Sequence, residues 1–405
     1  MVETIVRMGE KKMGVRVDEN HLSSYAGVVE GDKIYTVDSI YGLFLEYSMK
    51  DYSHRILTHI DCLDVSKGQY IINKIIKVRD VFYFFLVNCH DFISWSLSDY
   101  KFHIFESHQK KDQRYHLVSN AFFWEGKIWI CPAYSDQSFR CFDTVTEKMT
   151  EYASIEKRIC NHGIRFEGGQ FIYASIENDR LWFAIYNTPY IASYNMKKDE
   201  WRFYSLADFG KVFNICFDGN DLWICFMDQN IFLSWEPERG VKEIFQISDS
   251  ELSMDKGDPF KYIYGDQNYV YAIPTYDNNI YAVHRVTKKI DSTDFLHNYN
   301  RTDIRPYVPL FHVCIRVGKQ LILLPYAIDK IVVINMETGK LQYIDSLISQ
   351  IDQAVYLDYV CKQKSIQESD ELTLKEYISY IHFRKAGRLE QKRGVFGQVI
   401  AHEIV

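Results

Sequence analysis

The stretch NDRLWFAIYNTPYIASYNMKKDEWRFYSL, from Asn178 to Leu206, decides the fold because it consists of three short apolar runs separated by polar turns. The runs are rich in aromatic and β-branched residues, which favour strands. Asn and Asp in the turns accept the positive φ that tight hairpins need. We therefore expect an antiparallel meander in this stretch.

The same pattern recurs along the chain. With Leu181 as the anchor, matching residues lie 41 to 53 positions apart, at Ile34, Val81, Ile128, Leu222, Val270 and Leu321. An earlier apolar strand, such as 211–216, precedes each anchor and is followed by a polar turn, such as 218–221. Units of about 40 to 50 residues with four strands are typical of β-propeller blades. The sequence predicts an all-β, seven-bladed β-propeller over 22–346.

The ends of the chain leave alternatives open. Residues 1–21 contain two strand-like runs, and another lies at the C-terminus, so either end could close the ring by pairing with an outer edge. A six-bladed ring follows if 22–60 is not a blade, and an eighth partial blade follows if the ends add one. Residues 347–405 form an extension, with a helix expected after Asp370 and a basic-rich segment that is a solvated surface or a docking tail.

Composition narrows the class of protein. The chain of 405 residues is 47% apolar and 16% aromatic, with a net charge of −7, which argues against a nucleic-acid partner. We find no apolar leader at the start and no apolar run long enough to span a membrane, so we expect no membrane partner. Nine scattered cysteines without a C-x-x-C pair indicate buried thiols in a reducing cytoplasm.

Three repeats carry a family resemblance: LWFAIYNTPYIASYNMKKDEW, KIWICPAYSDQSFRCFDTVTEKM and LILLPYAIDKIVVINMETGK. They resemble the propeller group that includes streptogramin-lyase-like and NHL-like repeats. The kelch, WD and sialidase-type signatures are absent from the sequence. The resemblance implies the fold and carries over no activity, and the catalytic histidine of the lyase-like enzymes has no assigned counterpart here.

The candidate binding face is formed by two sets of loops, those that follow each second strand and those that precede each inner strand. Both sets open onto the central channel of a propeller. Tyrosines in these loops combine a flat apolar ring with a hydroxyl and suit peptides or glycans. Arginines there can hold a carboxylate or phosphate through two parallel hydrogen bonds. The candidate ligand-binding residues are Tyr134, Tyr186, Tyr190, Tyr276, Tyr326, Asp136, Asp277, Arg114, Arg165 and Arg305.

A second set of candidates lies in the inner strands, eight residues before the anchors. Polar side chains recur at this position within otherwise apolar strands, so each needs a hydrogen-bond partner. They either bridge adjacent blades or line the channel and meet a ligand. The candidates are Asn73, Asn120, Tyr173, Asn214 and Tyr262.

Three functions follow from these patterns. The first is a cytoplasmic binding or scaffold propeller that holds a peptide or protein partner on an aromatic, mixed-charge face. The second is a channel-mouth enzyme, a lyase or carbohydrate-active enzyme, with His116, His162 or His312 as general acid or base. The third is a sensor of a small molecule or sugar. The histidines form no H-E-x-x-H or H-x-H pattern, so we expect no metal and no cofactor.

Overall fold

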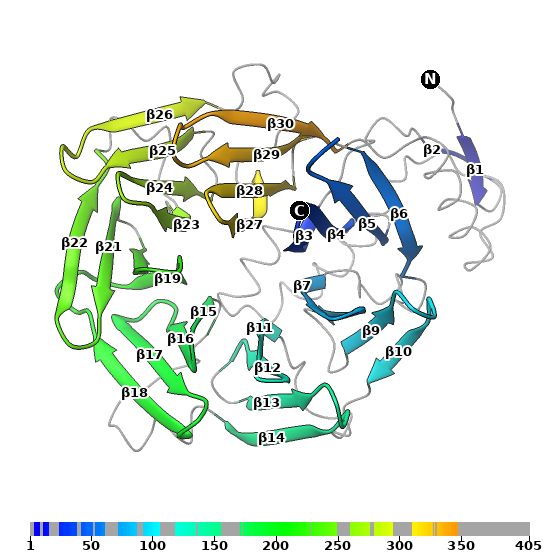
Figure 1. The fold of residues 1–405 in the computed structure, drawn as a ribbon, viewed down its shortest axis with the longest axis horizontal. Coiled ribbons are helices and arrows are strands. Elements are labelled where there is room, and N and C mark those ends of the chain that lie inside the picture. Colours follow the sequence, from blue (N-terminus) through cyan, green and yellow to red (C-terminus); the bar gives the residue numbers. More distant parts are fainter. Residues whose placement is uncertain are drawn as a thin grey trace.

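The computed structural model describes residues 4–8, 11–15, 24–38, 42–51, 53–60, 72–86, 92–105, 118–134, 137–154, 171, 173–227, 229–248, 260–275, 279–294, 310–326, 328 and 330–346. Every regular element in these ranges is a strand. Seven four-stranded antiparallel sheets are arranged radially around a common centre (Figure 1). The protein is a seven-bladed β-propeller, which confirms the predicted fold class and leaves seven blades rather than six or eight.

Each blade consists of four consecutive strands. Blade 1 contains β3 (Ser24–Glu30), β4 (Lys33–Asp38), β5 (Leu43–Ser48) and β6 (His54–His59). Blade 2 contains β7 (Ile72–Val78), β8 (Val81–Leu86), β9 (Phe92–Ser96) and β10 (Phe102–Phe105). Blade 3 contains β11 (Val118–Trp124), β12 (Lys127–Pro132), β13 (Ser138–Asp143) and β14 (Met149–Ser154). Blade 4 contains β15 (Ala174–Glu177), β16 (Arg180–Ala184), β17 (Tyr190–Asn195) and β18 (Glu200–Ser205).

The remaining blades follow the same order. Blade 5 contains β19 (Val212–Phe217), β20 (Leu222–Phe226), β21 (Ile231–Glu236) and β22 (Gly240–Gln246). Blade 6 contains β23 (Phe260–Gly265), β24 (Tyr269–Pro274), β25 (Asn279–His284) and β26 (Ile290–Asp294). Blade 7 contains β27 (Phe311–Val317), β28 (Gln320–Pro325), β29 (Lys330–Asn335) and β30 (Leu341–Asp345). The first strand of each blade is its inner strand.

The ring closes by packing between blades 7 and 1. The inner strands β27 and β3 are in contact, and each of the two sheets has four strands of its own, with none from elsewhere in the described part of the chain. The two strands predicted before the first unit, β1 (Thr4–Met8) and β2 (Lys11–Val15), pair with each other in a sheet of their own. The predicted helix and strand in 347–405 lie outside the described residues.

The core lies between the blades. Seven apolar clusters are present among the described residues, and each is built from two neighbouring blades. Ile34, Leu181 and Leu321, three of the anchors, are fully buried in these clusters. A single blade leaves both faces of its sheet apolar, so it becomes stable only when a neighbour covers each face. This is why the chain repeats the same pattern seven times.

The strand pairing corrects the alignment of the second repeat. In the other blades the anchor pairs with the residue five positions before it, as Leu181 pairs with Ile176. In blade 2 this relation holds for Phe82, which pairs with Lys77 and is fully buried, whereas Val81 is half-buried. The anchor of this repeat is therefore Phe82. The predicted alignment was wrong by one residue because the apolar run VFYFF fits either register.

Candidate functional site

Among the described residues, the inner strands of six blades begin with a β-bulge. The pairing skips Asn73, Ser119, Phe213, Lys261 or His312 in blades 2, 3, 5, 6 and 7, and in blade 1 the irregularity lies between Ser24 and Gly27. Bulges turn a side chain away from its regular direction and recur near functional sites. We call this end of the propeller, where inner strands begin and second strands end, the bulge end.

At the bulge end, His312 of blade 7 lies within a cluster from three blades. The ring of Tyr25 from blade 1 stacks on the imidazole at 4.2 Å between centroids, and Tyr326 meets it edge-on at the same distance. The Tyr25 hydroxyl donates to the Tyr326 hydroxyl at 2.9 Å. On the other side, Nζ of Lys261 from blade 6 lies 2.8 Å from Nδ1 of His312. We call these four residues the His312 cluster.

Burial and charge keep His312 neutral. Its side chain is 6% exposed, and burial, together with the adjacent Lys261 ammonium, holds the pKa of His312 well below its ordinary value. An ammonium can only donate, so Nδ1 accepts the hydrogen bond and the ring proton resides on Nε2. Tyr25 and Tyr326 are half-buried, so the cluster combines a buried neutral base with two aromatic rings that retain accessible surface.

The polar residues of the inner strands connect neighbouring blades. Asn120 donates through Nδ2 to the carbonyl of Ala174, and Asn214 donates in the same way to Lys261 of the next blade. Asn73 donates to the carbonyls of Val118 and Ser119 at 2.6 and 2.9 Å. These bonds are the blade-bridging contacts that a polar residue in an apolar strand requires.

The two inner-strand tyrosines also reach the next blade. The Tyr262 hydroxyl donates to the carbonyl of His312. The ring of Tyr173 meets Phe213 of blade 5 at 5.1 Å between centroids. Both tyrosines are half-buried, so a role for their exposed surface toward a ligand stays a prediction.

The predicted loop tyrosines have different environments. Tyr326 belongs to the His312 cluster. Tyr134 is half-buried after β12, and its carbonyl accepts from the N–H of Gln137 at 3.2 Å. Tyr190 is half-buried at the start of β17. Tyr186 is 6% exposed, which leaves little of its side chain open to a ligand. Binding by these four tyrosines stays a prediction.

The other predicted site residues lie outside the described part of the chain. They are Tyr276, Asp136, Asp277, Arg114, Arg165, Arg305, His116 and His162. Of the three candidate histidines, only His312 can therefore be placed, and its neighbours are a lysine and two tyrosines.

Sequence reasoning did not single out Tyr25 or Lys261 as site residues. Tyr25 and His312 are 287 positions apart (312 − 25) and meet only because blade 7 closes on blade 1. A signal was nevertheless present: Tyr25, Lys261 and His312 all lie nine residues before their anchors. Aligning that position across the repeats would have brought the three residues together.

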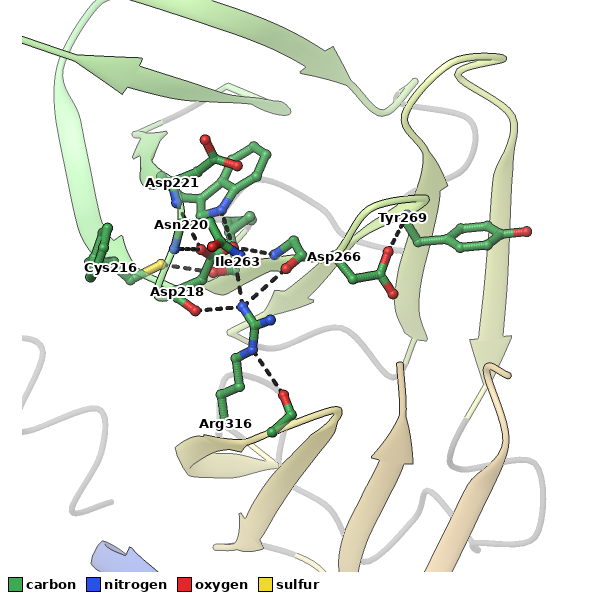
Figure 2. A network of polar contacts seen from close by, with 12 residues as sticks. Cys216, Asp218, Asn220, Asp221, Ile263, Asp266, Tyr269 and Arg316 are labelled. Atoms are coloured by element: carbon green, nitrogen blue, oxygen red, sulfur yellow. Dashed lines mark hydrogen bonds and ion pairs between the residues drawn. The ribbon is translucent and has the colours of Figure 1, made fainter. Parts of the chain in front are cut away.

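The opposite end of blades 5 to 7 is built around Asp218 (Figure 2). This residue opens the turn 218–221, and its Oδ1 accepts from the N–H groups of Asn220 and Asp221. Its Oδ2 accepts from Nε1 of Trp223 at 2.7 Å and from the N–H of Gly265 at 2.6 Å. The predicted tight hairpin turn is thus confirmed, since Phe217 pairs with Leu222 across it. The Asp218 carboxylate stabilises the turn by accepting hydrogen bonds from backbone and indole N–H groups.

Arg316 of blade 7 joins the same network. Its Nη1 donates to the carbonyls of Asp218 in blade 5 and Gly265 in blade 6, and it lies 3.7 Å from Oδ2 of Asp218. We call Asp218, Trp223, Gly265 and Arg316 the Asp218 network, and this end of the propeller the turn end. The Asp218 side chain has no exposed surface, so the network is a structural connection between three blades.

A second ion-pair group adjoins it. Nζ of Lys242 lies 2.6 Å from Oδ1 of Asp221, and Nη2 of Arg285 lies 3.0 Å from Oδ2. Burial alone would raise the pKa of Asp221, but the hydrogen bonds and charges of Lys242 and Arg285 hold it below its ordinary value. Asp221 is therefore ionised at neutral pH.

The described ranges contain neither a metal-binding cluster nor a membrane-spanning helix. No group of three or more His, Cys, Asp or Glu side chains there is arranged to hold a metal ion. The same residues include no helix with the length and apolar character needed to cross a membrane.

Comparison with known proteins places the fold among β-propellers. Neither the protein-family models nor the curated proteins contain a match. Among solved structures, YCF48 from Cyanidioschyzon merolae is 9% identical with a TM-score of 0.56, over 82% of this chain and 97% of that one. The Cps50 (Swd1) β-propeller domain of Myceliophteria thermophila is 12% identical with a TM-score of 0.51, over 81% and 98%. YCF48 bound to D1 peptide is 9% identical with a TM-score of 0.52, over 83% and 99%.

Proposed function

We propose that the protein is a cytoplasmic binding or scaffold propeller that holds a peptide segment of a partner protein at the bulge end. The observation that carries the proposal is the His312 cluster. Tyr25 and Tyr326 come from blades that meet only at ring closure, and both retain accessible surface at the bulge end. Half-exposed tyrosines fixed by their neighbours lose little conformational entropy on binding and are frequent anchors of protein interfaces.

The comparisons are consistent with this function without assigning it. One of the similar solved structures is a YCF48 propeller bound to D1 peptide, and at 9% identity the likeness carries the fold alone. The described cysteines Cys131, Cys141, Cys216, Cys225 and Cys314 are free thiols, which is consistent with a reducing compartment.

A peptide library tests the proposal. Random peptides displayed on phage are selected on the full chain, and the dissociation constants of the selected peptides are measured for wild type and for Tyr326→Ala. We expect Tyr326→Ala to weaken binding by about tenfold or more, as loss of a central aromatic anchor does. Tyr343→Ala is the matched control, because Tyr343 is 46% exposed on the outer strand β30 of the same blade.

The melting temperatures of the three proteins are compared first, so that a loss of binding is not a loss of folding. Peptides that bind wild type and Tyr343→Ala equally, and Tyr326→Ala weakly, support binding at the bulge end. If selection yields no peptide, or if the selected peptides bind Tyr326→Ala as tightly as wild type, the proposal is wrong.

A further inference from the structure

Lys74 in the inner strand β7 differs from the residues that align with it. Once the second repeat is aligned on Phe82, Lys74 takes the position that Asn120, Asn214 and Tyr262 occupy in blades 3, 5 and 6. Those three side chains donate hydrogen bonds to the backbone of the next blade. The Lys74 ammonium instead lies 5.5 Å from the centroid of the Phe122 ring in blade 3.

No carboxylate balances this charge within the described residues. Lys77 in the same strand forms an ion pair with Glu30 at 2.6 Å, whereas Lys74 has neither an ion pair nor a hydrogen bond in the described part of the chain. Lys74 is half-buried, and burial lowers its pKa. A partly desolvated ammonium without a counter-charge is unfavourable for folding unless a ligand supplies the negative charge.

The charge along the inner strands is asymmetric. Their first halves, at the bulge end, carry two cations, the half-buried Lys74 and the buried Lys261, whereas His312 there is neutral. The described inner-strand acids, Glu30 and Glu177, are the last residues of β3 and β15, at the turn end, where Lys77 and Arg316 offset their charge. At the bulge end of the second strand β4, Asp38 is fully buried and is not presented to a ligand. The described inner strands thus carry cations and no acid in their first halves, although the chain has a net charge of −7.

From this asymmetry we infer that the peptide segment held at the bulge end is acidic, and that a carboxylate of the segment pairs with the Lys74 ammonium beside the Phe122 ring. The inference rests on the proposed function and specifies the chemistry of the partner. The carboxylate supplies the counter-charge that the described chain does not, and the aromatic ring helps to hold the ammonium in place.

A protein segment fits this site better than a nucleic acid. A phosphate backbone presents closely spaced charges and is held by a stripe of Lys and Arg. The bulge end instead offers separate cations on blades 2 and 6, with the aromatic rings of Tyr25 and Tyr326 nearby. An acidic side chain between apolar or aromatic residues suits this combination of separate cations and aromatic rings, and the net charge of −7 opposes a long polyanion.

The test compares two fluorescein-labelled octapeptides of identical sequence, one with Glu and one with Gln at alternate positions separated by Leu and Tyr. Binding to the full chain is followed by fluorescence anisotropy at low and at physiological salt. We expect the Glu peptide to bind about tenfold more tightly than the Gln peptide at low salt, with the preference decreasing as salt screens the pair. In Lys74→Met the two peptides should bind equally.

Two control variants keep the test decisive. Lys74→Arg retains the charge and should keep the preference for Glu. Lys101→Met removes an exposed lysine just before the outer strand β10 of the same blade and should behave as wild type. Should Lys74→Met fail to fold, Lys74→Gln, which also removes the charge but keeps a polar side chain, takes its place, and in it too the two peptides should bind equally.

The outcomes separate this inference from the proposed function. Equal binding of both peptides to wild type, with weaker binding of both to Tyr326→Ala, would leave the peptide-binding function in place and refute the acidic partner. A Glu preference that survives in Lys74→Met, or an octathymidylate that binds more tightly than the Glu peptide, would also overturn the inference. If neither peptide binds, the inference is wrong, and the library selection decides the proposed function independently.

Discussion

The two ends of the propeller use polar residues in opposite ways. At the turn end, both oxygens of Asp218 accept N–H groups, and Arg316 links the same residue to blades 6 and 7. At the bulge end, Lys74 has no carboxylate within the described chain, and Tyr25 and Tyr326 keep accessible surface. A fully satisfied buried network contributes to stability, whereas charge and aromatic surface left open are suited to a ligand.

The largest expected effect on the free energy of unfolding is at the turn end. Asp218→Ala leaves the Trp223 indole N–H and the Gly265 N–H without their acceptor, and it removes the cap of the turn 218–221. We expect a loss of about 3 to 5 kcal/mol in the free energy of unfolding, as for other broken buried networks. The measurement is the urea midpoint, followed by fluorescence.

Blade 4 supplies the matched control for this variant. Glu177 occupies the equivalent position, four residues before the anchor, and accepts a hydrogen bond from the Trp182 indole at 2.8 Å. Because Glu177 is half-buried, Glu177→Ala should cost about 1 kcal/mol. Equal losses in the two variants would contradict the view that the Asp218 network is a special link between blades.

The next expected effect is on the pH dependence of stability, which differs between the two ends of the propeller. His312 is neutral in the folded protein and has a pKa well below its ordinary value, whereas an unfolded histidine binds a proton near pH 6.5. Between these pKa values the unfolded state therefore holds the extra proton. Stability should fall as the pH is lowered below 6.5, by up to about 1.4 kcal/mol per pH unit.

The variant His312→Gln isolates this contribution, since the other histidines titrate in both proteins. The urea midpoint of wild type should fall more steeply than that of His312→Gln between pH 6.5 and 5. Asp221 at the turn end behaves differently: its pKa is lowered in the folded protein, so its contribution is present above about pH 4 and is lost on further acidification. If the urea midpoints of wild type and His312→Gln change in parallel between pH 6.5 and 5, His312 is not held neutral in the folded protein.

The sequence was sufficient to predict the architecture but not the contacts that form the candidate site, and the reason is physical. Alternating apolar strands and polar turns such as 218–221 are local signals, and they yielded the blade number and the order of strands. The alignment at Val81 was wrong because five consecutive apolar residues carry no register information. The contacts of Tyr25 with His312, and of Arg316 with Asp218, depend on ring geometry, which no local pattern encodes.

The smallest expected effect concerns the hydroxyl pair at the bulge end. Tyr326→Phe and Tyr25→Phe each remove one partner of the 2.9 Å hydrogen bond while keeping the ring contacts with His312. Each should cost about 1 kcal/mol in the free energy of unfolding, and the double variant should cost less than the sum, with a coupling energy of about 0.5 to 1.5 kcal/mol. Strictly additive losses would mean that the two hydroxyls do not interact. Because the rings remain in these variants, peptide affinity should change far less than in Tyr326→Ala, which separates the contribution of the hydroxyl pair to stability from the contribution of the rings to the proposed peptide binding.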